Sequence, residues 1–154
     1  MDRKSTSSIH LLRGRHLLRS VVSTQAVQAL SSGEAEFTAT VKAGSMALGA
    51  RSMYRDFGEV VKVIEISTDS NASKGILSRR GLGKVRHLDT AMLWIQHDVQ
   101  DQTFTLKKVK GTENSADLGT KDLAEREMRS CLARIDVEES SGRHPLALTI
   151  QSAG

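Results

Sequence analysis

Residues 60–67, "VVKVIEIS", restrict the choice of fold more than any other segment of this chain. Apolar side chains, many of them β-branched, occupy both odd and even positions, which is the pattern of a strand buried on both faces. A strand of this kind needs helices on both sides of its sheet. Helical patterns lie before and after it, so the sequence predicts an α/β domain with a mixed sheet flanked by helices.

The helical pattern before this strand starts at a capping box formed by Ser31 and Glu34 and ends near Gly58. Two glycines inside it, Gly44 and Gly49, each cost such a helix about 0.8 to 1 kcal/mol relative to alanine, so we expect close packing there. The apolar residues recur at steps of three and four, as on one face of an amphipathic helix. They are Ala39, Ala43, Met46, Ala50, Met53 and Phe57.

Weaker patterns predict the remaining elements. We expect a short helix in residues 70–81, a helix from Asp89 to residue 99, a strand in 103–111, and a final helix in 114–135 capped by Asn114 or Ser115. Residues 1–29 leave two alternatives open. They could form a hairpin of residues 9–13 and 16–22 about Gly14, or an Arg-rich amphipathic helix of the kind found in mitochondrial transit peptides.

Length and composition limit the class of protein. A chain of 154 residues suits one domain, which we expect in residues 1–135, with a disordered tail in 136–154. The single cysteine, Cys131, excludes an internal disulfide framework and favours a reducing intracellular compartment, cytoplasmic or nuclear. No apolar run reaches membrane-spanning length, so no membrane partner is expected. Trp94 and Cys131 lie on helical stripes and are expected in the core.

Positive charge is concentrated in three segments. Lys and Arg number 22 against 18 Asp and Glu, a formal net charge of +4, and they cluster in residues 3–19, 74–86 and 107–110. The second cluster, "KGILSRRGLGKVR", contains no acid. Charge runs are usually solvated faces, and a nucleic-acid footprint is the alternative. Under that alternative, the candidate contacts to a nucleic-acid backbone are Lys74, Arg79, Arg80, Lys84 and Arg86.

Carboxylates form the most informative constellation. Glu34 is explained by capping, whereas Glu36 begins the core-facing stripe and is costly there unless it is paired or bound to a cation. Asp69 follows the central strand, at the sheet edge where ligands bind in open α/β folds, and Asp117 lies in the first turn of the last helix. Convergence of Glu36, Asp69 and Asp117 would favour hard cations, Mg²⁺ or Mn²⁺, and a pair of such ions suits phosphodiester cleavage. The alternative is that Asp69 only caps a helix and Asp117 only complements a helix dipole.

Several motifs occur together: "RKSTSS", "ALSSGEAEF", "STDSNAS", "VRHLD" and "GTENSADLGTK". In this order they resemble the ribonuclease H region of copia-type retrotransposon Pol polyproteins over residues 3–123. The resemblance implies a ribonuclease H-like fold, two Mg²⁺ ions and cleavage of the RNA strand of RNA/DNA hybrids. It also implies origin in a polyprotein that contains reverse transcriptase, and it argues against the transit-peptide alternative.

Residue by residue, the resemblance places the helix carboxylate of the family on Glu36, its strand-end carboxylate on Asp69 and its late carboxylate on Asp117. The leading carboxylate of the family lies on its first central strand, in an Asp-x-Asp-Trp-Ala-Gly segment before "RKSTS" that residues 1–3 do not contain. The resemblance therefore implies an N-terminally truncated domain, in which that strand and one metal ligand are missing. Two functions stay open, a ribonuclease H and a non-catalytic nucleic-acid-binding remnant. His87 and Asp89 match a His-x-Asp segment, in which Asp89 is expected to cap a helix.

Overall fold

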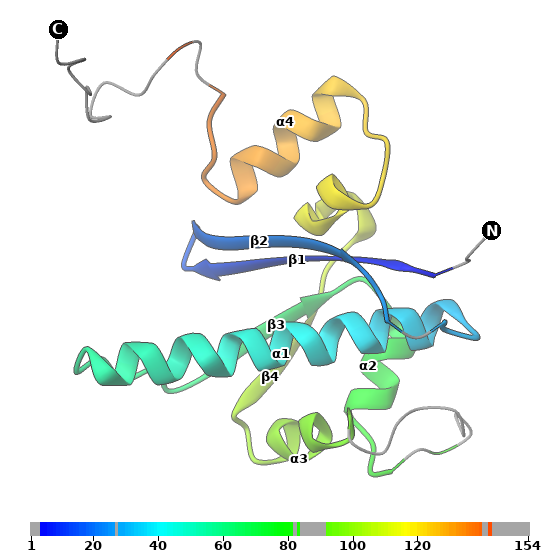
Figure 1. The fold of residues 1–154 in the computed structure, drawn as a ribbon, viewed down its shortest axis with the longest axis vertical. Coiled ribbons are helices and arrows are strands. Elements are labelled where there is room, and N and C mark those ends of the chain that lie inside the picture. The colour runs from blue at the N-terminus through cyan, green and yellow to red at the C-terminus, as the bar shows by residue number, and fades with distance from the viewer. Residues whose placement is uncertain (1–3, 27, 82, 84–91, 140–141, 143–154) are drawn as a thin grey trace, which may run out of the picture.

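The chain folds into a small α/β assembly. A computed structural model describes residues 4–26, 28–81, 83, 92–139 and 142 (Figure 1). In chain order the elements are β1 Thr6–Arg13, β2 His16–Thr24, α1 Ser32–Asp56, β3 Ile64–Thr68, α2 Asn71–Leu77, α3 Trp94–Gln100, β4 Phe104–Lys108, the 3₁₀ helices η2 Gly111–Glu113 and η3 Ser115–Gly119, and α4 Glu125–Arg134. No helix in these residues combines the length and apolar composition needed to cross a membrane.

The first segment is a β-hairpin. β1 pairs antiparallel with β2 from Thr6 opposite Thr24 to Arg13 opposite His16. Gly14, in the turn, has a φ of +62°, a left-handed conformation that glycine adopts without a steric cost. The hairpin alternative for residues 1–29 is therefore confirmed. It lies along α1, between that helix and the segment that holds η3 and α4 (Figure 1).

The second sheet is a parallel pair of β3 and β4, aligned from Ile64 opposite Phe104 to Thr68 opposite Lys108. The expectation of a strand over residues 60–67, buried on both faces, is wrong in detail. The strand begins only at Ile64, and Val60 and Val63 are 81% and 51% exposed. The physical reason is that, among the described residues, β3 has a strand partner on one side alone. In place of the single mixed sheet expected, the described residues form two separate two-stranded sheets.

The core lies where α1 crosses β3, β4, α2 and α3. Its members are buried apolar residues: Phe37, Val41, Ala47, Ile66, Ile76, Leu77, Ile95 and Phe104. The buried row of α1 runs through Phe37, Val41 and Gly44, so the stripe expected from the sequence is wrong at its end, where Met53 and Phe57 are 54% and 76% exposed. At Gly44 a Cβ atom would come within 3.0 Å of the Ile95 side chain, which confirms the expected close packing there. At Gly49 no atom lies within 4 Å of such a carbon, so the same expectation is wrong at that position.

The carboxyl-terminal part differs from the single helix expected over residues 114–135. The Asn114 side chain caps η3 by accepting a hydrogen bond from the Ala116 amide at 3.2 Å, as predicted. The helix then stops at Gly119, and α4 begins only at Glu125. Gly119 lies very close to the hairpin, and η3 packs against β1. The expected single helix is therefore interrupted between η3 and α4. Cys131 is buried, as expected.

We predict that Gly119→Ala destabilises the fold by about 1 to 3 kcal/mol, the usual cost of overpacking. A Cβ atom at this position would lie 2.4 Å from the Val22 side chain and 2.5 Å from the Ser8 hydroxyl oxygen. Urea denaturation measures the effect. The matched control is Gly49→Ala, where no atom lies within 4 Å of the added carbon and the helix gains about 0.8 to 1 kcal/mol. Equal stability changes in both variants would contradict the close contact at Gly119.

Candidate functional site: a carboxylate pocket

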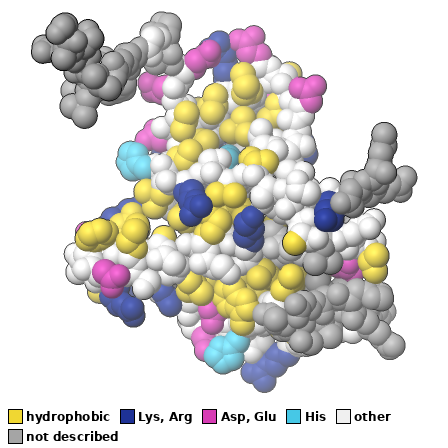
Figure 2. Space-filling view, in the orientation of Figure 1, with side chains coloured by type: hydrophobic (Ala, Val, Ile, Leu, Met, Phe, Trp, Pro, Cys, Tyr) yellow, Lys and Arg dark blue, Asp and Glu magenta, His cyan; other side chains and the backbone are white. Residues whose placement is uncertain are grey.

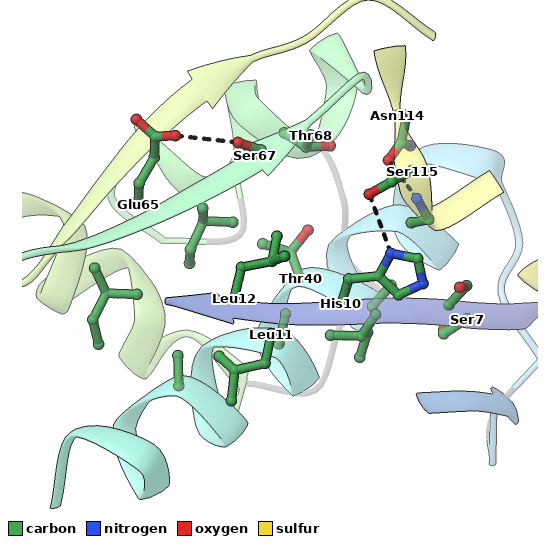
Figure 3. Close-up of a pocket in the computed structure, with 18 of the residues that line it drawn as sticks. Ser7, His10, Leu11, Leu12, Thr40, Glu65, Ser67, Thr68, Asn114 and Ser115 are labelled. Atoms are coloured by element: carbon green, nitrogen blue, oxygen red, sulfur yellow. Dashed lines mark hydrogen bonds between the residues drawn. The ribbon is translucent and has the colours of Figure 1, made fainter. Parts of the chain in front are cut away.

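The three carboxylates singled out in the sequence line a single pocket of about 630 Å³. Figure 3 shows part of this pocket, with Thr40, Thr68 and Asn114 among its labelled lining residues. Glu36 comes from α1, Asp69 from the end of β3, and Asp117 from η3. β1 forms a further wall. We call this space, with these three residues at it, the carboxylate pocket. All three residues border this one space, and their convergence on a single cation position stays a prediction.

Glu34 and Glu36 have different roles, as the sequence indicates. Ser31 caps α1 by accepting a hydrogen bond from the Glu34 amide at 3.2 Å, and the Glu34 carboxylate accepts one from the Leu30 amide at 2.9 Å. Glu34 is therefore used at the helix end. Glu36 begins the row of α1 side chains that faces the pocket, followed by Ala39 and Ala43.

Asp69 does not serve as a helix cap, which removes the simplest alternative explanation for it. The N-cap of α2 is Ser70, whose hydroxyl accepts a hydrogen bond from the Ser73 amide at 3.1 Å. Asp69 lies beside the chain that leaves β4, because a Cβ atom on Gly111 would be 3.6 Å from its carboxylate. That chain continues into η3, so the backbone itself brings Asp117 towards Asp69.

Asp117 is held by a lysine. The Lys121 ammonium lies 2.7 Å from an Asp117 carboxylate oxygen, and the Asp117 side chain is only 14% exposed. This hydrogen bond, more than any other cause, raises the pKa of Lys121, and the charges of Asp69 and Glu36 add to the effect. Lys121 thus places one positive charge among the three carboxylates.

Partial burial and neighbouring charges both shift the pKa of Glu36. Desolvation raises the pKa of Glu36 above its ordinary 4.5, the charges of Asp69 and Asp117 raise it further, and Lys121 lowers it. Glu36 is an exposed residue, so the expectation of a costly charge on a core-facing stripe is wrong in that respect, although nearby protein partly desolvates the carboxylate. Because the folded-state pKa is raised, ionised Glu36 opposes folding, and the stability it contributes falls as the pH rises from 4.5 through the folded-state pKa.

We predict that Lys121→Met raises the pKa of Glu36 further, because Lys121 is the charge that lowers it. A ¹³C NMR titration of glutamate side-chain carboxyls measures the shift directly. Lys107→Met is the matched control, since Lys107 pairs instead with Glu65 at 3.2 Å. An unchanged Glu36 titration in Lys121→Met would show that Lys121 does not act on the pocket.

The carboxylates are suited by chemistry to a hard divalent cation, because all three offer oxygen ligands and repel one another. No group of three or more His, Cys, Asp or Glu side chains among the described residues is already arranged around one metal position.

Several polar residues of the pocket were not identified as site residues from the sequence, among them His10 and Lys121. The His10 ring nitrogen Nδ1 lies 3.1 Å from the Ser115 hydroxyl, which ties β1 to η3 (Figure 3). Desolvation lowers the pKa of His10 below 6.5, so the neutral ring is favoured. Only the pairing of the hairpin with η3 brings these residues together. For Lys121, in contrast, the spacing of four residues from Asp117 was a usable signal.

The predicted nucleic-acid contacts lie apart from the carboxylate pocket. Lys74 belongs to α2, Arg79 and Arg80 follow it, and none of the three lines the pocket. Arg80 donates a hydrogen bond to the Gln100 side chain at 2.8 Å. The predictions for Lys84 and Arg86, and for His87 with Asp89, fall outside the described residues.

Comparison with known proteins gives one informative relative. A retrovirus-related Pol polyprotein from transposon TNT 1-94 of Nicotiana tabacum is 27% identical over 105 residues, which is 67% of this chain and 8% of that polyprotein. No family model matches the chain. No solved structure matches it significantly. The similarity supports an origin in a retrotransposon Pol polyprotein, of whose length this chain spans a small part.

Proposed function

We propose that this chain is the ribonuclease H region of a copia-type retrotransposon Pol polyprotein, and that it hydrolyses the RNA strand of RNA/DNA hybrids. One observation carries the proposal: Glu36, Asp69 and Asp117, far apart in the sequence, line one pocket. These are the residues on which the resemblance places the family's carboxylates. The similarity to a Pol polyprotein supports the same origin.

In this proposal Glu36, Asp69 and Asp117 hold Mg²⁺ or Mn²⁺. Bound ions would supply an activated water molecule and would stabilise the leaving oxygen. Of the chain's own residues, Lys121 orients the Asp117 carboxylate, and the partly desolvated Glu36 carboxylate lies within electrostatic reach of Asp69 and Asp117, whose negative charges a bound cation would offset. The proposal further requires a fourth carboxylate, which the resemblance expects on a strand before residue 3.

The test is cleavage of an RNA/DNA hybrid whose two strands carry different fluorophores. We expect cuts in the RNA strand alone, dependent on Mg²⁺ and abolished by EDTA. Duplex DNA of the same sequence serves as the control substrate. If the folded chain leaves the RNA strand intact, with or without an added upstream segment carrying Asp-x-Asp-Trp-Ala-Gly, the catalytic proposal fails.

A second candidate function is nucleic-acid binding without catalysis. It is favoured by the placement of Lys74 and Arg80, which lie outside the carboxylate pocket, and by the basic side chains spread over the face seen in Figure 2. Binding of this kind weakens with salt, with a slope of about −0.9 per neutralised phosphate, and needs no Mg²⁺. Fluorescence anisotropy of a labelled hybrid in EDTA, over a salt series, distinguishes it from the nuclease.

A further inference from the structure

Asp117 lies on an element too short to fix its own position. It is the middle residue of η3, a 3₁₀ helix of 5 residues. Helices of this type have poorer hydrogen-bond geometry than α-helices. The pairing of Asp117 with Lys121 is local, four residues along the same segment, so it orients the carboxylate without joining η3 to another element. The place of Asp117 in the carboxylate pocket therefore depends on what η3 packs against.

β1 packs against η3 and contacts both of its ends. At the first residue, the Ser115 hydroxyl lies 3.1 Å from His10 Nδ1, a contact between residues 105 positions apart in the sequence (Figure 3). At the last residue, a Cβ atom on Gly119 would be 2.5 Å from the Ser8 hydroxyl oxygen. Ser8 and His10 are two residues apart on a strand, so both lie on the face of β1 that meets η3. Asp117 lies between these two contacts.

The two contacts differ in kind. The one at Gly119 is close packing, and the buried Ser8 hydroxyl oxygen there has no hydrogen-bond partner among the described residues. The one between His10 and Ser115 is a hydrogen bond, and both of these residues line the carboxylate pocket. α4 also packs against η3, but none of its residues lines the pocket. The hydrogen bond is thus a directional link between η3 and the pocket wall that β1 forms.

The state of the histidine ring suits a constant link. Desolvation lowers the pKa of His10, so the ring is neutral at neutral pH. The nitrogen of a neutral imidazole donates or accepts according to its tautomer, and a serine hydroxyl can supply the complementary partner in either case. Unlike Lys121, neutral His10 adds no charge to the pocket. It can therefore hold η3 without weakening the attraction of the carboxylates for a cation.

We propose that His10 is a positioning residue that acts through Ser115. The hydrogen bond holds η3 against β1, and this keeps Asp117 where it can share a divalent cation with the other two carboxylates of the pocket. The inference rests on the proposed function, which assigns a cation to these carboxylates. Removal of outer groups that orient metal ligands typically lowers metal affinity by about 10- to 100-fold. Because His10 acts through a second residue, we expect the lower end of this range.

The test measures Mn²⁺ binding to the full chain by electron paramagnetic resonance, which detects the free ion and needs no cleavage reaction. His10→Phe keeps a ring without its nitrogens, and Ser115→Ala removes the hydroxyl. Each should weaken Mn²⁺ binding about tenfold. The double variant should bind no more weakly than either single one, because all three lack the same hydrogen bond. Circular dichroism checks that each variant is folded.

Conservative variants separate this hydrogen bond from general packing. Ser115→Thr keeps the hydroxyl, and His10→Asn places an amide atom near the position of Nδ1, so both should retain most of the affinity. His16→Phe is the matched control on the same hairpin. Its side chain is 80% exposed, pairs with Asp136 at 2.9 Å and does not line the pocket, so its loss should leave Mn²⁺ binding unchanged.

Amide hydrogen exchange reports on η3 without any metal. The amides of Asp117, Thr120 and Lys121 donate hydrogen bonds within this segment, and they should exchange faster in His10→Phe while the ladder of β1 with β2 is unchanged. Unchanged exchange in η3, retained Mn²⁺ affinity in His10→Phe, or an equal loss in His16→Phe would overturn the inference alone. If the unmodified chain binds no Mn²⁺, the proposed function and the inference both fail. Mn²⁺ binding without RNA cleavage would count against the proposed function alone.

Discussion

Phe104→Ala is expected to destabilise the fold by about 3 to 5 kcal/mol, which is comparable to the whole stability of many small domains. Phe104 is 1% exposed and begins β4, in the middle of the core cluster. Its ring lies 6.2 Å from the Trp94 ring, centroid to centroid, at an interplanar angle of 56°. It also approaches α1 at Gly44, where a Cβ atom would be 3.4 Å away. The truncation therefore leaves a cavity between two helices and a sheet.

Phe57→Ala is the matched control, since it removes the same atoms from a side chain that is 76% exposed. Its effect should stay within about 0.5 kcal/mol, as for most surface substitutions. Thermal and urea unfolding of both variants give the comparison. Similar losses at the two positions would mean that the packing around Phe104 is not the main apolar contact of this fold.

Much of the fold could be predicted from the sequence where local signals are strong. The start of α1 follows from Ser31 and Glu34, whose hydrogen bonds are local. The hairpin about Gly14 was one of two alternatives that the local sequence left open, and the resemblance favoured it. The β4 strand also falls inside its predicted segment. These features depend on residues close in sequence, so one short window contains their cause.

The isolation of β3 could not be predicted, because it depends on what lies beside the strand. The apolar composition of residues 60–67 indicates burial on both faces, but burial also requires neighbours, and β3 has β4 alone as a described strand partner. The break after Gly119 has a similar origin. A continuous helical pattern runs through that region, and contact with Ser8 and Val22 of the hairpin places η3 where a continuous helix would not pass.

The common lining of the carboxylate pocket could be predicted in part. Asp69 after a strand and Asp117 after the next parallel strand are brought to one end of a sheet by topology, and Glu36 by the orientation of α1. The way in which these charged side chains affect one another depends on the tertiary structure and could not be predicted from the sequence. The pKa of Glu36 depends on distances between three elements, and the His10 to Ser115 contact depends on the docking of η3 against β1.

Asp69→Asn is expected to reduce cleavage of the RNA strand by at least about 100-fold, the usual cost of removing one preorganised electrostatic partner of a transition state. The substitution is isosteric, and because Ser70 rather than Asp69 caps α2, the fold should keep its melting temperature. Asp101→Asn is the matched control, since Asp101 lies after α3, outside the carboxylate pocket, and pairs with His97 at 3.0 Å. Initial rates on the labelled hybrid at saturating Mg²⁺ measure both variants. Retention of the full rate by folded Asp69→Asn would place any cleavage outside this pocket, whereas loss in both variants would indicate a general effect of charge on hybrid binding.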